Sequence, residues 1–84
     1  MKILVTGAAG RLGRASRRAL RQAGHQLRIA DLPTSALEPA EGEVALAGNL
    51  CEPSVMDQAL EGIEVVVHWA ASLNVPDFNL VLEN

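Results

Sequence analysis

The chain has 84 residues, 49% of them hydrophobic and 20% charged, and its formal net charge at neutral pH is −3. This length allows one small domain, and the composition is that of an ordinary globular protein. No apolar run approaches the ~20 residues of a membrane-spanning helix, and a single cysteine, Cys51, cannot form an internal disulfide bond. We therefore expect a cytoplasmic protein with no membrane partner.

The charges are distributed unevenly. All seven basic residues lie at or before Arg28, and all ten acidic residues lie at or after Asp31. Five arginines crowd residues 11 to 21, and such a basic segment can bind nucleic acid. Aromatic residues, on which single strands stack, are limited to one tryptophan and one phenylalanine. The pattern therefore favours arginines on the solvated face of an amphipathic helix and predicts no nucleic-acid partner.

The first part of the chain is predicted to form a strand, a helix and a second strand. Lys2 to Thr6 is a short apolar run rich in β-branched residues, which is typical of a buried parallel strand. A helix should follow and end at Gly24, because glycine readily adopts the left-handed conformation that closes a helix. Residues 26 to 31 should form the second strand. The apolar side of the helix is expected to consist of Leu12, Ala15, Ala19, Leu20 and Ala23.

The second part of the chain repeats the alternation. Residues 32 to 42 contain two prolines and a glycine and should be mostly loop. Residues 43 to 47 and 64 to 68 should form the third and fourth strands, joined by a helix that begins at Pro53 and ends before Gly62. Asp77 should cap a last helix. The apolar face of the joining helix is predicted to be Val55, Met56, Ala59 and Leu60.

Strands that alternate with helices predict an α/β fold with a parallel sheet and right-handed crossovers. The expected architecture is a partial doubly wound (Rossmann) sheet in three layers, with strand order 3-2-1-4. In such sheets the ligand crevice lies where the strand order reverses. Here that point is between the ends of the first and fourth strands, at Gly7 and Trp69.

Three glycines follow the first strand at a G-x-x-G-x-x-G spacing and lead directly into the helix. Gly7 would allow the tight turn, Gly10 the approach of a pyrophosphate to the backbone, and Gly13 the close packing of helix on sheet. The free N–H groups and the positive end of the helix would attract the phosphates. We expect valine at Gly10 or Gly13 to abolish cofactor binding with little loss of soluble protein.

Asp31 ends the second strand, 18 residues after Gly13. A carboxylate there can accept hydrogen bonds from the hydroxyls of an adenosine ribose, and it would repel the 2′-phosphate of NADP. NAD is therefore the expected cofactor, with NADP disfavoured. Arg11 is the competing consideration, because a guanidinium beside the loop can also reach a 2′-phosphate.

The glycine spacing resembles that of the short-chain dehydrogenase/reductase superfamily, and two further segments resemble its extended branch, the NAD-dependent epimerase/dehydratase family. Gly48-Asn49-Leu50 follows the third strand where that family usually has Gly-Asp-Leu, and residues 66–71 resemble its V-x-H-x-A-A segment. The resemblance spans the whole chain. Within the family, residues 7–13 with Asp31, and residues 76–79, are most similar to uronate dehydrogenases.

This resemblance implies contacts beyond the glycine-rich loop. The Asn49 side chain, which keeps an acceptor oxygen in place of the family's acid, and the next backbone N–H would hold the adenine ring. Small residues after the fourth strand would leave room for the ribose and pyrophosphate, although Trp69 is bulkier than the family's usual aliphatic residue. The predicted cofactor-binding residues are Gly7, Ala9, Gly10, Arg11, Leu12, Gly13, Asp31, Asn49, Leu50, Ala70, Ala71 and Ser72.

No catalytic residue is predicted in this chain. The superfamily's chemistry resembles acid–base catalysis by a tyrosine with a lysine four residues later, but the chain has no tyrosine, and its only lysine is Lys2. His68 is expected to be a packed, hydrogen-bonded histidine. Cys51 has no metal-ligand partner at a useful spacing and is not expected to be a catalytic thiol.

Two functions remain open at this point. Residues 1–84 are expected to be the N-terminal, NAD-binding Rossmann half of an oxidoreductase or epimerase that acts on a sugar or related small molecule, with the catalytic and substrate-binding remainder absent. The alternative is a non-catalytic NAD-binding module or cofactor sensor. In either case the fourth strand should expose an apolar edge, Val65 to Val67, through which the chain is expected to self-associate.

Overall fold

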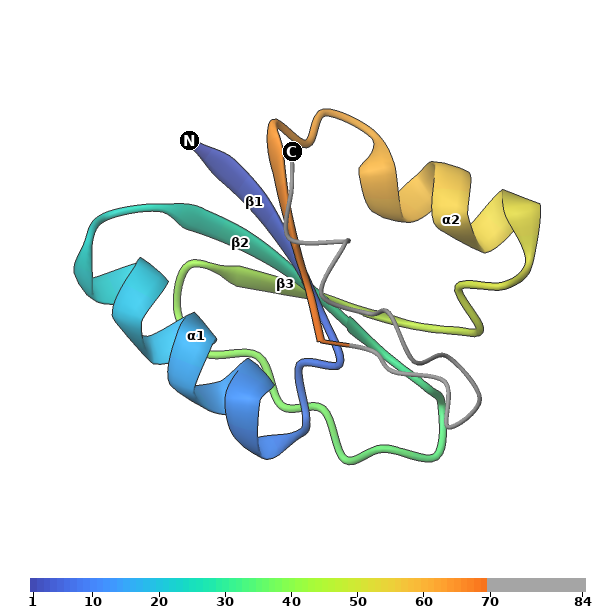
Figure 1. The fold of residues 1–84 in the computed structure, drawn as a ribbon, viewed down its shortest axis with the longest axis horizontal. Coiled ribbons are helices and arrows are strands. Elements are labelled where there is room, and N and C mark those ends of the chain that lie inside the picture. The colour runs from blue at the N-terminus through green and yellow to red at the C-terminus, as the bar shows by residue number, and fades with distance from the viewer. Residues whose placement is uncertain (70–84) are drawn as a thin grey trace.

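The structure, a computed structural model, describes residues 1–69. One parallel sheet contains β1 (Lys2–Thr6), β2 (Gln26–Asp31), β3 (Glu43–Ala47) and β4 (Val65–His68), in the order β3-β2-β1-β4. Helices α1 (Arg11–Gln22) and α2 (Pro53–Leu60) cover opposite faces of this sheet (Figure 1). The predicted three-layer α/β architecture and strand order are confirmed, whereas the helix expected after Asp77 lies outside the described residues.

Each face of the sheet carries its own apolar core, because successive side chains of a strand point to opposite faces. Ile3, Val5 and Ile29 belong to the cluster against which Leu20 of α1 packs. Leu4 and Ala30 belong to the opposite cluster, together with Ala59 of α2. Full burial of one aliphatic side chain contributes about 1.5–3 kcal/mol. Between residues 1 and 69, no helix is both long and apolar enough to cross a membrane.

Helix α1 presents a different face to the sheet from the predicted one. Gly13 and Arg17 are its buried residues, and Leu20 is half-buried. The predicted apolar side is wrong at four positions: Leu12 is 55% exposed, and the three alanines of that side are exposed as well. The assignment of all five arginines to the solvated face is also wrong, because Arg17 is 8% exposed. The physical reasons are a close helix-to-loop contact at Gly13 and an ion pair at Arg17.

Helix α1 is closed, as predicted, by Gly24 in the left-handed conformation. Gly24 has a φ of 91°, the left-handed conformation that an L side chain rarely adopts. Its N–H donates to the Arg21 carbonyl at 2.9 Å, and the His25 N–H donates to the Leu20 carbonyl at 3.2 Å. These two bonds satisfy carbonyls that the helix itself leaves free, and they turn the chain into β2.

Candidate functional site

The carboxyl ends of the strands meet at one edge of the sheet, as the parallel arrangement requires. Gly7 follows β1 with a φ of 63°, which allows the chain to turn sharply toward α1. The Trp69 N–H, just after β4, donates to the Thr6 carbonyl at 3.2 Å. The Gly48 N–H, just after β3, donates to the Asp31 carbonyl at 3.0 Å. The structure therefore brings the predicted crevice positions, Gly7 and Trp69, to the same edge as Asp31.

Gly10 lies at the open point of the glycine-rich loop. Its N–H donates to the Gly7 carbonyl at 3.1 Å, and it forms the N-cap of α1. Within residues 1–69, no side chain caps this helix end by a hydrogen bond. Among the same residues, a Cβ built at Gly10 would meet only the Gly7 carbonyl oxygen, at 3.4 Å. This part of the chain therefore leaves room above Gly10, next to the positive end of a helix, where an anionic group can bind.

Gly13 has a different role from Gly10. A Cβ at this position would overlap the Gly7 carbonyl oxygen and lie 2.7 Å from the Ala8 Cα. Those atoms are backbone and cannot rotate away, so the absent side chain permits α1 to contact the loop. The expectation that valine at Gly13 would spare the fold is therefore wrong, because the clash is with the protein rather than with a ligand.

The carboxylate of Asp31 is bound on both of its oxygens. Oδ2 accepts from the Ala9 N–H at 2.8 Å, which joins the end of β2 to the glycine-rich loop. Oδ1 accepts from the Leu32 N–H at 2.8 Å and from the Ser35 hydroxyl at 2.9 Å. An ionised carboxyl group has about four acceptor sites. The bonds from residues 1–69 therefore leave capacity for a ligand hydroxyl on a carboxylate whose orientation they already set.

An ion-pair cluster beneath the loop is the main feature that sequence reasoning missed. Arg17 binds Glu43 bidentately, through Nε at 3.0 Å and Nη2 at 2.7 Å, and Arg21 binds the same carboxylate at 2.7 Å. The Glu43 side chain is fully buried. Arg17 also donates to the carbonyls of Ala8, at 3.0 Å, and Glu38, at 2.9 Å. The cluster thus ties α1 to the start of β3 and to both flanking loops.

Burial alone would raise the pKa of Glu43. The hydrogen bonds from Arg17, from the Ala40 backbone N–H and from Arg21 outweigh it, as does the charge of Arg17, and together they lower this pKa from 4.5 to about 2. The carboxylate therefore stays ionised in the folded protein under conditions in which it would be protonated in the unfolded chain.

We expect the free energy of unfolding to fall as the pH decreases from about 5 to about 2. A carboxyl group with a lowered pKa stabilises the fold above its unfolded-state pKa, and this stabilisation is lost as the pH falls through the folded-state value. The loss is at most about 3 kcal/mol, reduced by solvent screening around the partly exposed Arg21. Urea unfolding between these pH values should show that the free energy of unfolding depends less on pH in Glu43→Gln than in the unsubstituted chain. The exposed Glu41→Gln variant is the control, and identical pH dependence in all three proteins would contradict the prediction.

The remaining predicted residues divide into three groups. Arg11 and Leu12 are the first two residues of α1, and both are exposed. Asn49 is exposed, and its Oδ1 accepts from the Cys51 N–H at 2.9 Å, while the Leu50 side chain packs against the core on the α2 side. The third group lies outside the described residues and consists of Ala70, Ala71 and Ser72.

Two side-chain hydrogen bonds hold the end of β4 in place at this edge. A hydrogen bond of 2.7 Å joins Thr6 Oγ1 and His68 Nδ1, which confirms the prediction of a hydrogen-bonded histidine. The indole N–H of Trp69 donates to the Ser16 hydroxyl at 2.8 Å, so β4 is tied to α1.

Cys51 is an exposed free thiol. Residues 1–69 contain no cluster of three His, Cys, Asp or Glu side chains that could hold a metal ion.

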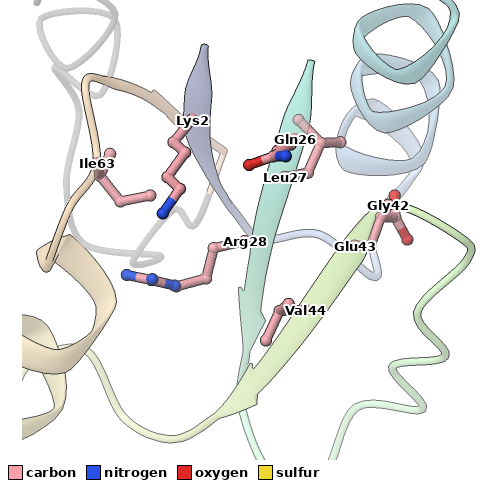
Figure 2. A pocket seen from close by; sticks show the side chains of 8 residues that line it. All are labelled: Lys2, Gln26, Leu27, Arg28, Gly42, Glu43, Val44 and Ile63. Carbon is pink, nitrogen blue, oxygen red and sulfur yellow. The ribbon is translucent and has the colours of Figure 1, made fainter. Parts of the chain in front are cut away.

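A hollow of about 370 Å³ lies at the opposite, amino-terminal edge of the sheet (Figure 2). Lys2 and Arg28 reach into it from β1 and β2. The Arg28 guanidinium donates to the carbonyls of Gln58, Ala59 and Glu61, at 3.1, 3.0 and 2.6 Å. It thereby satisfies the free carbonyls at the end of α2. The hollow is therefore lined by a helix cap and is separate from the glycine-rich loop.

Comparison with known proteins identifies the family. The sequence profile described as the NAD dependent epimerase/dehydratase family matches residues 3–81. This chain belongs to that family. Membership agrees with the glycine-rich loop, with Asp31 at the end of β2 and with the strand order of the sheet.

The proteins that this chain is similar to include enzymes of known structure. Uronate dehydrogenase of Pseudomonas syringae pv. tomato is 31% identical over 68 residues, which are 81% of this chain and 25% of that protein. A variant of the uronate dehydrogenase of Agrobacterium tumefaciens, solved in complex with NAD, is 36% identical with a TM-score of 0.74, covering 96% of this chain and 30% of the enzyme. WbmG of Bordetella bronchiseptica, also in complex with NAD, is 28% identical with a TM-score of 0.74, and the match covers 98% of this chain and 28% of WbmG. The chain spans about a quarter of the length of the curated relatives that it matches.

Proposed function

We propose that residues 1–84 form the N-terminal, dinucleotide-binding part of an NAD-dependent oxidoreductase or epimerase that acts on a sugar or a related small molecule. The observation that carries this proposal is the 2.8 Å hydrogen bond from the Ala9 N–H to the Asp31 carboxylate. It places a loop suited to a pyrophosphate beside an acceptor suited to ribose hydroxyls. The similarity to a uronate dehydrogenase and to WbmG, both solved with NAD, supports the assignment.

The residues of this edge fit the parts of the dinucleotide. The uncapped start of α1 and the open space at Gly10 suit the pyrophosphate. Asp31 would accept from the hydroxyls of the adenosine ribose, and Asn49, at the end of the neighbouring strand, would face the adenine. A bound nicotinamide would supply the chemistry of hydride transfer. The part of the chain described here would bind and orient the cofactor.

We expect the chain to bind NAD at least about tenfold more tightly than NADP, a difference of about 1.4 kcal/mol. The reason is repulsion between the Asp31 carboxylate and the 2′-phosphate. Isothermal titration calorimetry with both dinucleotides measures the ratio, and Arg11→Gln is the matched variant because Arg11 is the competing cation. Equal or tighter binding of NADP would reject the role of Asp31, and an absence of binding by both would reject the proposed function.

A second candidate is a non-catalytic NAD-binding module or cofactor sensor. The 84 residues contain no tyrosine, and their only lysine, Lys2, lies at the opposite end of β1 from the glycine-rich loop. This would favour the second candidate only for a protein that consists of these 84 residues alone. Both candidates predict NAD binding and differ in turnover.

Self-association at the outer edge of β4 stays a prediction.

A further inference from the structure

Arg17 makes a contact that its ion pair does not require. Two of its N–H groups bind Glu43, and this bidentate arrangement fixes the plane of the guanidinium. A further N–H, on Nη1, donates to the carbonyl of Ala8 at 3.0 Å, in the middle of the glycine-rich loop. The Arg17 side chain is only 9% exposed, so its charge acts on that carbonyl with little screening by water.

The Ala8 carbonyl and the Ala9 N–H belong to the same peptide group. No described peptide bond is cis, so in this planar trans unit the carbonyl and the N–H point in opposite directions. The carbonyl accepts from Arg17, and the N–H donates to Asp31 Oδ2 at 2.8 Å. The peptide is therefore clamped between a buried cation and a carboxylate. A cation on the carbonyl oxygen polarises the peptide and strengthens the bond that its N–H donates.

We propose that Arg17 is a positioning residue for cofactor recognition, which acts through the Ala8–Ala9 peptide to hold the Asp31 carboxylate in place for the adenosine ribose. This inference rests on the proposed function, because it assigns Asp31 to the ribose. Arg17 and Asp31 bind opposite sides of this peptide. Arg17 therefore need not touch the ribose itself, and its effect would be transmitted through the peptide.

Arg21 is the natural comparison. It binds the same Glu43 carboxylate at 2.7 Å, from one helical turn further along α1. Within residues 1–69, its side chain makes no hydrogen bond to the glycine-rich loop. A role limited to tying α1 to β3 would therefore be shared by both arginines, whereas an effect on Asp31 belongs to Arg17 alone.

The first test needs no cofactor. The amide proton of Ala9 is followed by nuclear magnetic resonance in the free chain, in Arg17→Lys and in Arg21→Lys. A lysine keeps the cation near buried Glu43 but cannot reproduce the fork of guanidinium bonds. We expect the resonance of the Ala9 amide proton to move upfield both in Asp31→Asn, which weakens the acceptor directly, and in Arg17→Lys, and to stay in place in Arg21→Lys. Equal movement in both lysine variants, or none in either, would overturn the proposal.

The second test measures affinity for NAD and for an NAD analogue that lacks the 2′-hydroxyl of the adenosine ribose. We expect Arg17→Lys to weaken NAD about tenfold, to weaken the analogue far less, and so to reduce the discrimination between the two. Arg21→Lys should leave both affinities within about twofold of the unsubstituted chain. An equal loss for both ligands in Arg17→Lys would show a general structural effect and overturn the proposal.

The two tests separate the inference from the function on which it rests. If the unsubstituted chain binds no NAD, the proposed function fails, while the Ala9 amide still reports whether Arg17 acts on the bond to Asp31. Arg17→Met combined with Glu43→Gln removes the cation without leaving a buried unpaired carboxylate. It should move the Ala9 amide as Arg17→Lys does. Unfolding of both Arg17 variants while Arg21→Lys folds would assign Arg17 to stability alone and overturn the proposal.

Discussion

Replacing Gly13 by alanine is expected to lower the free energy of unfolding by about 3 kcal/mol or more, since overpacking against atoms that cannot move is costly. The added Cβ would overlap the Gly7 carbonyl oxygen and lie 2.7 and 2.9 Å from the Ala8 Cα and carbonyl carbon. Relief requires α1 to move off the loop, which would weaken the buried contacts that Leu20 makes on that face of the sheet. A small domain has only about 5–15 kcal/mol of stability in total.

The matched control is Gly10→Ala, which adds the same methyl group to the same loop. Its Cβ would lie 3.4 Å from the Gly7 carbonyl oxygen, an ordinary contact, and Gly10 has a φ of −79°, which any residue adopts. We expect this variant to change stability by less than about 1 kcal/mol, mostly through the poorer N-cap. Urea unfolding of both variants measures the difference. Equal midpoints for the two would show that the loop tolerates a side chain at either place.

The strands were predictable because glycines and prolines interrupt short apolar runs. The predicted bounds of β1, β2 and β3 agree with the structure, and β4 begins at Val65 rather than at Glu64. The strand order followed from the alternation of strands with helices and from the handedness of crossovers. Strand bounds and strand order could be predicted because they depend on local residue patterns and on the order of the elements, both of which can be read from one sequence.

The orientation of α1 was not predictable in the same way. Counting alanines as apolar placed Ala15 and Ala19 toward the sheet, whereas both are exposed. Gly13 decides the contact instead, because the position with no side chain approaches the loop most closely. Arg17 can then be buried, since its acceptors lie on Glu43, 26 residues away, and on two carbonyls. Hydrophobic periodicity contains no information about such a partner.

The sequence nevertheless contained a signal for this cluster. Alternation along the third strand places Glu43 on the same face as Ala45 and Ala47, the face that α1 covers. A buried carboxylate needs a cation, and two arginines four residues apart, at positions 17 and 21, lie on one side of a helix. By contrast, the glycine-rich loop and Asp31 were found from residue type and spacing alone. Their joining through the Ala9 N–H required the structure.

Replacing Gly10 by valine is expected to reduce the affinity for NAD at least about 100-fold, or about 2.7 kcal/mol, while the chain stays folded. Gly10 has an extended backbone, with φ −79° and ψ 175°, which suits a β-branched residue. Among residues 1–69, only the Gly7 carbonyl oxygen lies within contact distance of a Cβ at Gly10, so the valine methyl groups should extend into the open space over the loop. That space is where the proposed pyrophosphate must approach the start of α1.

Calorimetry with NAD, together with urea unfolding of the same samples, separates binding from folding. Ala15→Val is the matched control, because it adds the same bulk to an exposed position of α1 away from the loop; its affinity should be unchanged. Gly10→Ala should bind with intermediate affinity, since one methyl group fills less of the space than three carbons do. Undiminished affinity in Gly10→Val would mean that the pyrophosphate does not pass over Gly10. The anion-binding role of the loop would then have to be abandoned, even though its glycine spacing and its bond to Asp31 would remain.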